Sequence, residues 1–272
     1  MSEPVLALAA RYDAVLLDAF GVLVDGSGAL AGAAELIGAL RSRGDNFLVV
    51  TNDSSRLPET VAARLRSFGL EVEPDRVVTS GSLIAPYFAR HDLHGARCIV
   101  LGPADSHTYV ERAGGTIIEA SPDAACDAVI VCDEDGYEFL DTLDATLSAV
   151  IHRLEAGADV ALIQPNPDLI YPKASGSYGF TCGAATLLLE AGLARRFPGL
   201  RPTFDRLGKP NRELFDEACR RAGSRHVLMV GDQLETDIAG AHAAGLDSAL
   251  VATGITRDLS EVALAPTFLA HL

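Results

Sequence analysis

The sequence predicts an α/β fold of three layers, in which helices cover both faces of a parallel sheet. Short apolar runs rich in β-branched residues alternate with stretches of helical spacing along the chain. This alternation is typical of parallel sheets, because each crossover between strands lays a helix against one face. Three of the runs end at or beside a polar residue, namely Asp18, Thr51 and Asp232. Because ligands of such sheets bind beyond the carboxyl ends of the strands, these residues are the first functional signal.

The two ends of the chain carry the expected elements of one domain. Apolar runs predict strands at Ala14–Leu17, Phe47–Val50, Val77–Val78, His226–Val230 and Ser248–Ala252. Apolar residues three and four positions apart predict helices at Ala31–Arg43 and Pro58–Phe68, and a last helix that ends at Ala244. A glycine follows the second and the third of these helices, as is common at helix ends.

The middle of the chain has an αβ alternation of its own. Apolar runs predict strands at Cys98–Leu101, Ala128–Val131 and Val160–Ile163, and helical spacing predicts helices at Tyr109–Ala113 and Phe139–Leu154. We therefore expect two domains, a core formed by residues 1–83 and 183–272 and a second αβ domain, residues 84–182, inserted into it.

Composition restricts the possible partners. The formal charge of −15 argues against nucleic acid and anionic membranes, whose phosphates need clustered cations. A small phosphorylated substrate stays possible, because a local patch of cations and Mg²⁺ reverses the field inside a cleft. No apolar run approaches the roughly 18 residues of a membrane helix, and the run Val5–Ala10 is too short for a secretory signal. We expect a cytoplasmic protein whose five cysteines, none in a C-x-x-C pair, are reduced structural thiols.

Two segments of the first part carry groups suited to phosphoryl chemistry. Residues 16–23 read LLDAFGVL, which places Asp18 directly after a strand. A carboxylate there is either a turn residue or a nucleophile that a nearby cation screens from phosphate. Residues 49–55 read VVTNDSS, which places Thr51 and Asn52 between a strand and a helix. A hydroxyl and free backbone N–H groups at such a position bind phosphate oxygens, although they also cap helices.

Two further segments lie in the last part of the chain. Residues 208–210 read GKP, which places Lys209 before a helix, and residues 231–237 read GDQLETD, which places Asp232 directly after a strand. Mg²⁺ prefers carboxylate and carbonyl oxygens together with water, so Asp232 and Asp18 are candidate ligands. Asp237 is expected to orient the metal ligands without binding the metal itself.

In this order and spacing, the four segments resemble the motifs of the haloacid dehalogenase-like (HAD) hydrolases. The resemblance covers nearly the whole chain and implies a Rossmann-like core with an inserted αβ cap. It implies that Asp18 becomes an aspartyl phosphate and that Thr51, Asn52 and Lys209 bind the phosphate. It also implies one Mg²⁺ held by Asp18, the backbone carbonyl of Phe20 and Asp232.

The place of the insert, between the second and third motifs, resembles the NagD-like subclass. Proteins of this subclass carry an Asn-Pro-Asp loop in the cap, matched here by residues 166–168. The alternative is an ordinary proline turn. The resemblance implies that Asn166 and Asp168 contribute to substrate specificity, and it makes a homodimer through the cap possible.

One residue departs from the family pattern. Phosphatases of the superfamily carry a second Asp two positions after the nucleophile, where it protonates the leaving group, and this chain has Phe20. P-type ATPases and 2-haloacid dehalogenases also lack that Asp, but the dehalogenases do not need the metal-binding Asp that is retained here as Asp232. Asp25 is the nearest carboxylate that follows in the chain and is a possible substitute. Asp53 is a smaller departure, since Asn is common there, and it either pairs with Arg56 or caps the following turn.

These expectations lead to a Mg²⁺-dependent hydrolase of a small phosphorylated metabolite, restricted by the lost acid to substrates with good leaving groups. General acid catalysis is worth roughly 10²–10⁴-fold in rate. Two alternatives stay open at this stage. One is a catalytically impaired relative that binds a phosphate ligand or a partner, and the other is a hydrolase of C–halogen or C–P bonds.

Overall fold

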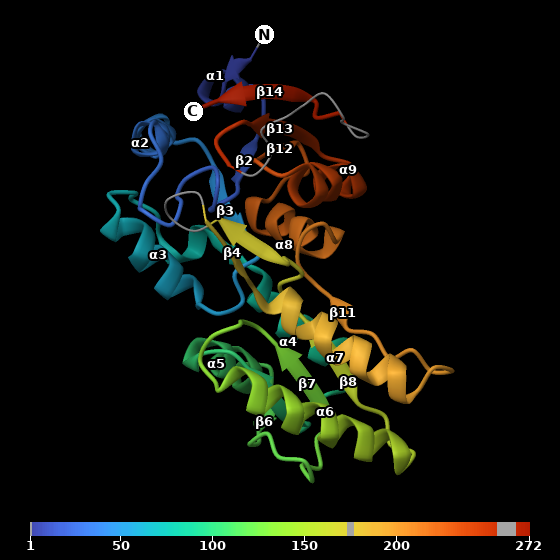
Figure 1. The fold of residues 1–272 in the computed structure, drawn as a ribbon. Helices are drawn as coiled ribbons and strands as arrows, with labels where there is room; N and C mark the ends of the chain where they lie inside the picture. Colours follow the sequence, from blue (N-terminus) through green and yellow to red (C-terminus); the bar gives the residue numbers. More distant parts are fainter. Residues whose placement is uncertain (1, 173–176, 255–264) are drawn as a thin grey trace.

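The fold consists of two parallel sheets, each covered by helices, and Figure 1 shows them one below the other. The computed structural model describes residues 2–172, 177–254 and 265–272. Within this part of the chain, the larger sheet has the order β1-β14-β13-β12-β2-β3-β4. Its strands are β1 (Glu3–Pro4), β2 (Ala14–Leu17), β3 (Phe47–Thr51), β4 (Val77–Thr79), β12 (Val227–Gly231), β13 (Asp247–Val251) and β14 (Phe268–His271).

Alternate residues of these strands face opposite layers of helices. Leu17 and Val49 belong to an apolar cluster with α1 (Val5–Ala9), α2 (Ala33–Arg43) and α3 (Pro58–Ser67). Leu16 and Val50 belong to a second cluster with α8 (Arg212–Ala222) and α9 (Ala239–Ala244). Both faces of β2, β3, β4 and β12 are therefore buried, which explains why these strands read as continuous apolar runs. The predicted three-layer α/β core is confirmed.

The second sheet has the order β11-β8-β7-β5-β6. Its strands are β5 (Arg97–Leu101), β6 (Thr116–Ile117), β7 (Ala128–Val131), β8 (Ala161–Gln164) and β11 (Asp205–Arg206). One face packs against α4 (Ile84–Arg90) and α5 (Ala104–Arg112), and the other against α6 (Phe139–Glu155) and α7 (Cys182–Arg196). A short hairpin of β9 (Ile170–Pro172) and β10 (Tyr178–Phe180) precedes α7.

Strand β11 belongs to the second sheet, and this changes where we place the end of the inserted domain. Asp205 and Arg206 pair with β8 in the second sheet, and α7 packs on the same sheet. The expected return to the core at residue 183 therefore does not match the sheet membership of these elements. We propose that the insert begins near residue 84, as expected, but continues to about residue 206.

Most of the predicted elements lie within about two residues of their expected bounds, but α5 starts five residues before the expected Tyr109, and several elements were not predicted. The predicted start of α2 at Ala31 was too early, because Gly32 has a φ of 86° and precedes the first helical residue. The unpredicted helices and strands are β1, α1, α4, β6, β9, β10, α7, β11 and β14. The strands among them have two to four residues and lack the continuous apolar run that marked β2 and β7.

Two of the expectations from composition have a structural counterpart. All five cysteines are buried and free, as expected for structural thiols. None of the helices in the described ranges combines the length and apolar character that crossing a bilayer requires.

Candidate active site

The three polar residues at strand ends meet at one edge of the core sheet. Strand β2 lies between β12 and β3, and all three strands are parallel. Asp18 follows β2, Thr51 ends β3 and Asp232 follows β12, so the three residues come together at the carboxyl ends. From this edge the chain runs from β2 to β3 on one side and from β12 to β13 on the other. Open α/β sheets bind ligands where the direction of the connections reverses in this way.

A buried ion-pair network surrounds Asp18. Lys209 Nζ lies 2.7 Å from Asp18 Oδ1 and 2.7 Å from Asp237 Oδ1. The backbone N–H of Ala19 also donates to Asp18 Oδ1, at 2.8 Å. Asp237 Oδ2 accepts from the backbone N–H groups of Asp232 and Gln233, both at 3.1 Å. Both oxygens of Asp237 are thus engaged in holding Lys209 and the Asp232 loop.

Close approach of the backbone shapes the loop after Asp18. Gly21 has a φ of 83°, and a Cβ atom there would lie 2.4 Å from the carboxyl carbon of Asp232. Thr253 Oγ1 donates to the carbonyl of Gly21 and ties this loop to the end of β13. Only glycine satisfies both the left-handed backbone and the space left by Asp232.

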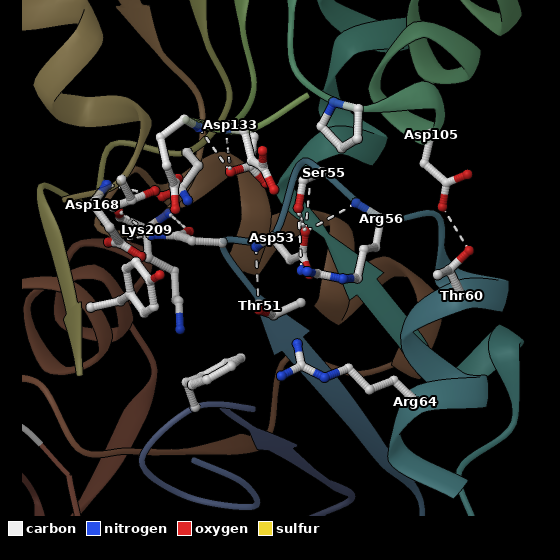
Figure 2. Close-up of a pocket in the computed structure, with 18 of the residues that line it drawn as sticks. Thr51, Asp53, Ser55, Arg56, Thr60, Arg64, Asp105, Asp133, Asp168 and Lys209 are labelled. Atoms are coloured by element: carbon white, nitrogen blue, oxygen red, sulfur yellow. Dashed lines mark hydrogen bonds and ion pairs between the residues drawn. The ribbon is translucent and has the colours of Figure 1, made fainter. Parts of the chain in front are cut away.

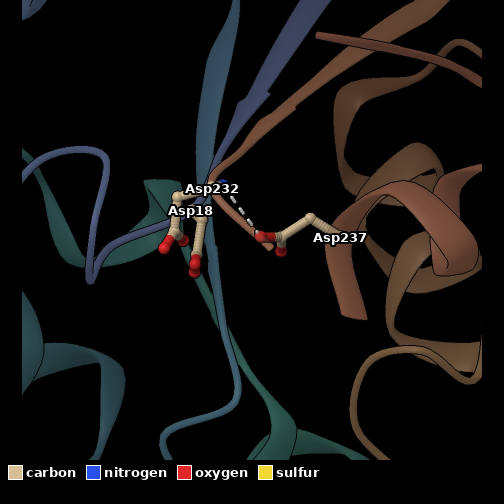
Figure 3. Close-up of side chains that lie close together, drawn as sticks. All are labelled: Asp18, Asp232 and Asp237. Atoms are coloured by element: carbon tan, nitrogen blue, oxygen red, sulfur yellow. Dashed lines mark hydrogen bonds between the residues drawn. The ribbon is translucent and has the colours of Figure 1, made fainter. Parts of the chain in front are cut away.

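Negative charge exceeds positive charge at this edge of the sheet. Carboxylate oxygens of Asp18, Asp232 and Asp237 lie within 4.8 Å of one another, and Figure 3 shows the three side chains converging. Burial and the charges of Asp237 and Asp232 raise the pKa of Asp18, against the lowering effect of Lys209. The Asp18 and Asp237 carboxylates raise the pKa of Lys209 despite its burial, so its ammonium stays charged. Three buried carboxylates against one ammonium suit a divalent cation with oxygen ligands.

The loop after β3 joins the core to the insert. The side-chain amide of Asn52 donates to Asp168 Oδ1 at 2.9 Å and to the Lys209 carbonyl at 3.1 Å. Its oxygen accepts from the Lys209 backbone N–H at 2.7 Å. A Cβ atom at Gly208 would lie 2.5 Å from that oxygen, which explains the glycine before Lys209. The Asn52 side chain is therefore structural, and its backbone N–H is the group left for the expected phosphate contact.

Thr51 and Asp53 have different surroundings in this loop. Thr51 is buried, and its hydroxyl accepts from the Asp53 N–H at 3.2 Å and keeps its proton to donate. Asp53 Oδ1 accepts from the backbone N–H groups of Ser55 and Arg56, at 2.9 and 3.0 Å. Asp53 Oδ2 accepts from the Arg56 guanidinium at 3.0 Å. Both alternatives for Asp53 thus hold, since it caps the turn and pairs with Arg56.

A cavity of about 750 Å³ opens above these residues, and its walls come from the core and the insert (Figure 2). The core contributes Asp18, Phe20, Thr51, Arg56, Arg64 and Lys209, among others. The insert contributes Asp105, Asp133, Glu134, Asp135, Asn166 and Asp168, among others. The volume suits a small molecule, and most of the side chains named here are polar or charged.

Comparison with known proteins places the chain in a family. It is 30% identical to an acid sugar phosphatase of Staphylococcus aureus over 262 residues, which cover 95% of this chain and 94% of that protein. The chain belongs to the haloacid dehalogenase-like hydrolases. Profiles of this HAD family match residues 15–116 and 206–271. A dihydroxyacetone phosphatase of Corynebacterium glutamicum is 29% identical over 245 residues, 89% of this chain and 82% of that one.

Solved structures of HAD phosphatases share the fold. A possible sugar phosphatase of Cytophaga hutchinsonii matches with a TM-score of 0.84 and 29% identity, over 99% of this chain and 97% of that one. A glycerol phosphate phosphatase of Mycobacterium tuberculosis, in complex with magnesium, matches with a TM-score of 0.78 and 29% identity, over 96% and 74%. The chain is accordingly a HAD hydrolase of the phosphatase type.

Phe20 and Asp25 follow Asp18 in the sequence, but only Phe20 lines the cavity. The Phe20 ring lines the cavity and has the Arg64 guanidinium carbon 5.3 Å from its centroid. Asp25 is partly exposed to solvent and accepts three hydrogen bonds from Ser27 and Gly28. These bonds lower the pKa of Asp25, and it does not line the cavity. Asp25 is therefore poorly suited to replace an acid.

The Asn-Pro-Asp loop lies over the HAD motifs. Asn166 Oδ1 accepts from the Asp168 N–H at 2.9 Å, which shapes the loop, and Asp168 reaches Asn52 of the core. Burial raises the pKa of Asp168, although the Lys209 charge and the bond from Asn52 oppose this. Both residues line the cavity.

Sequence reasoning missed five charged residues of the cavity, one of which is Asp105 in the first turn of α5. Arg64 lies inside an ordinary amphipathic helix, and Asp133, Glu134 and Asp135 follow β7 of the insert. Burial and the adjacent Asp133 raise the pKa of Glu134 to about 7. The position of the three acidic residues directly after a strand was a usable signal, whereas nothing local distinguishes Arg64 from Arg66, the other arginine of α3.

Proposed function

We propose that this HAD hydrolase releases phosphate from a small phosphorylated metabolite through an aspartyl phosphate on Asp18. The observation that carries the proposal is the buried pair of Asp18 and Lys209, 2.7 Å apart, at the base of a cavity of about 750 Å³. A carboxylate held by an ammonium at a strand end suits attack on phosphorus. The names of the relatives, phosphatases of sugars, dihydroxyacetone and glycerol phosphate, support this substrate class.

The residues divide the reaction into two steps. In the first, an Asp18 oxygen attacks phosphorus, the bond to the leaving oxygen breaks, and that oxygen leaves as an alkoxide or aryloxide, which takes a proton from water. In the second, water attacks phosphorus, the Asp18–phosphorus bond breaks, and inorganic phosphate is released. Lys209 and the Thr51 hydroxyl offset the charge on the phosphate oxygens in both steps. Asp237 positions Lys209, because it binds the same ammonium from the other side.

The buried carboxylates fit Mg²⁺, and we propose that Asp18, the carbonyl of Phe20 and Asp232 hold it. Bound there, Mg²⁺ lowers the repulsion between the Asp18 carboxylate and the phosphate. Asp237 stays outside the ligand set in this proposal, because its two oxygens already hold Lys209 and two backbone N–H groups.

We further propose that the insert is a cap that selects the substrate. Asn166 and Asp168 line the cavity, and Asp168 lies beside Lys209 and accepts a hydrogen bond from Asn52 of the core. Substrate size and polarity are then limited by this wall and by the carboxylates that follow β7. The cap therefore closes the cavity over the proposed nucleophile.

A panel of phosphate esters tests the proposed function directly. We expect the protein to release phosphate in the presence of Mg²⁺ from aryl, sugar and glycerol phosphates, and to release no halide from 2-haloacids. The measurement is free phosphate and free halide over time, with and without chelator. Binding of phosphate esters without turnover would instead support an impaired relative, and halide release without metal would support a dehalogenase.

The Phe20→Asp variant tests how the leaving group departs. A positioned acid is worth roughly 10²–10⁴-fold, but the Arg64 guanidinium beside this position would keep the new carboxyl ionised. We expect kcat on glycerol 3-phosphate to rise only about tenfold in the single variant and about 10²-fold in Phe20→Asp with Arg64→Gln. Kcat on p-nitrophenyl phosphate, whose leaving group needs no acid, should change less than about twofold.

The matched control is Phe20→Asn, whose side chain has the same shape as that of Phe20→Asp but carries no acidic proton. It should show no gain on glycerol 3-phosphate. Equal wild-type kcat on the two esters would contradict our account of Phe20, because another acid would then already be present. Glu134 is the carboxyl to examine in that case, by Glu134→Gln, since it lines the cavity and has a pKa of about 7.

A further inference from the structure

Arg64 is a cation of the cavity that the proposed reaction does not use. It comes from α3, is about half-buried and lines the cavity. Its guanidinium carbon lies 5.3 Å from the centroid of the Phe20 ring and 5.7 Å from that of Phe68. Figure 2 shows the guanidinium pointing into the cavity below Thr51.

The other two cations of the cavity are already paired. Arg56 binds the Asp53 carboxylate at 3.0 Å, and Lys209 binds Asp18 and Asp237. Arg64 has no carboxylate within 4.0 Å among the residues that the structure describes. Its guanidinium lies over the rings of Phe20 and Phe68. Burial and the Arg56 charge lower the pKa of Arg64, although the guanidinium stays protonated. A cationic side chain in this setting has donors to offer to an anion.

The position of Arg64 separates it from the acidic wall of the cap. Asp133 lies on the opposite side of the cavity in Figure 2, with Thr51 and Asp53 between them. Arg64 instead adjoins Phe20, two residues after the nucleophile. Arg64 therefore lies on the side of the cavity away from Asp133, where an anionic group of the substrate can meet a guanidinium.

We propose that Arg64 binds a second anionic group, a carboxylate or a second phosphate, on the leaving portion of the substrate. The proposal rests on the proposed function and narrows its substrate class to metabolites that carry such a group. A planar guanidinium donates two parallel hydrogen bonds to either group. Phe20 is a positioning residue for this contact, because stacking on its ring limits the orientations of the guanidinium before the substrate binds.

Kinetics on matched pairs of substrates test the proposal. The first pair is 3-phosphoglycerate and glycerol 3-phosphate, which differ in one carboxylate, and the second is fructose 1,6-bisphosphate and fructose 6-phosphate. We expect Arg64→Gln to raise KM for the anionic member of at least one pair by about tenfold or more. KM for the other member should change less than about twofold. The affected pair identifies a carboxylate or a phosphate as the group bound.

Two further variants serve as controls. Arg64→Lys keeps the charge but loses the planar fork, so it should restore only part of the affinity. Arg195→Gln removes one positive charge from the exposed surface of α7, away from the cavity, and should leave all four KM values unchanged. An equal rise of KM in every substrate, a fall of kcat without a change of the KM ratio, or no effect in either pair would overturn the proposal.

A binding measurement separates this proposal from the proposed function. If the wild type turns over neither these four esters nor p-nitrophenyl phosphate, the proposed function fails, and calorimetry with the four esters and Mg²⁺ still tests Arg64. Tighter binding of the anionic member that disappears in Arg64→Gln would then support the proposal alone. An equal affinity for both members of each pair would overturn it.

Discussion

The Asp18→Asn variant is expected to lose at least about 10⁴-fold in phosphatase kcat, because an amide is a poor nucleophile. The fold should survive the change. Asp237 keeps the buried Lys209 ammonium paired, at 2.7 Å, and the substitution removes one of three crowded carboxylates. The measurements are phosphate release and the thermal unfolding midpoint. Acid-quenched wild type should in addition carry phosphate on the peptide that contains Asp18.

The matched control for this variant is Asp144→Asn, the same substitution at an exposed position of α6. It should keep kcat within about twofold of the wild type. Wild-type turnover by Asp18→Asn would show that another group attacks phosphorus. A phosphate trapped on any other residue would lead to the same conclusion.

The Asp232→Ala variant is expected to lose about 10³-fold in activity at ordinary Mg²⁺ concentration, and chelation should have the same effect on the wild type. Asp232 is fully buried next to Asp18, so its carboxylate is disfavoured unless a cation compensates it. Mg²⁺ should therefore raise the unfolding midpoint of the wild type, since a ligand that binds only the folded state stabilises it. The midpoint of Asp232→Ala should respond far less.

Glu235→Ala is the control for the metal site, because Glu235 is an exposed carboxylate three residues after Asp232, in the short helical segment Leu234–Ile238. It should retain both the activity and the stabilisation by Mg²⁺. Full wild-type activity in excess chelator would contradict a metal-dependent reaction. An unchanged response of Asp232→Ala to Mg²⁺ would place the ion elsewhere.

The sequence by itself determined the α/β class and the main residues of the proposed site. Strands β2, β3 and β12 read as short apolar runs because helices bury both of their faces. Their ends are marked by Asp18, Thr51 and Asp232, and parallel strands bring such ends to one edge. The roles of Gly21 and Gly208 depend instead on tertiary structure, since each leaves room for a side chain distant in sequence, Asp232 and Asn52 respectively.

The boundary of the insert depended on tertiary structure. Strand β11 has two residues, too few for any periodic signal, and only its pairing with β8 shows that Asp205 and Arg206 belong to the second sheet. The role of Asp25 also depended on tertiary structure, because only its closeness to Phe20 in the sequence had suggested a substitute acid. Its side chain instead closes a turn with Ser27 and Gly28.

The contacts that give the cavity its chemistry were also decided by tertiary structure. Lys209 meets Asp18, Asn52 meets Asp168, and Arg64 meets Phe20 across separations that no local pattern encodes. Periodicity reports which face of an element is buried, because burial repeats with the turn of a helix or the pleat of a strand. It does not report which elements become neighbours. Arg64 therefore reads as a surface residue of α3 in the sequence and becomes a wall of the cavity only when α3 packs beside β2 and β3.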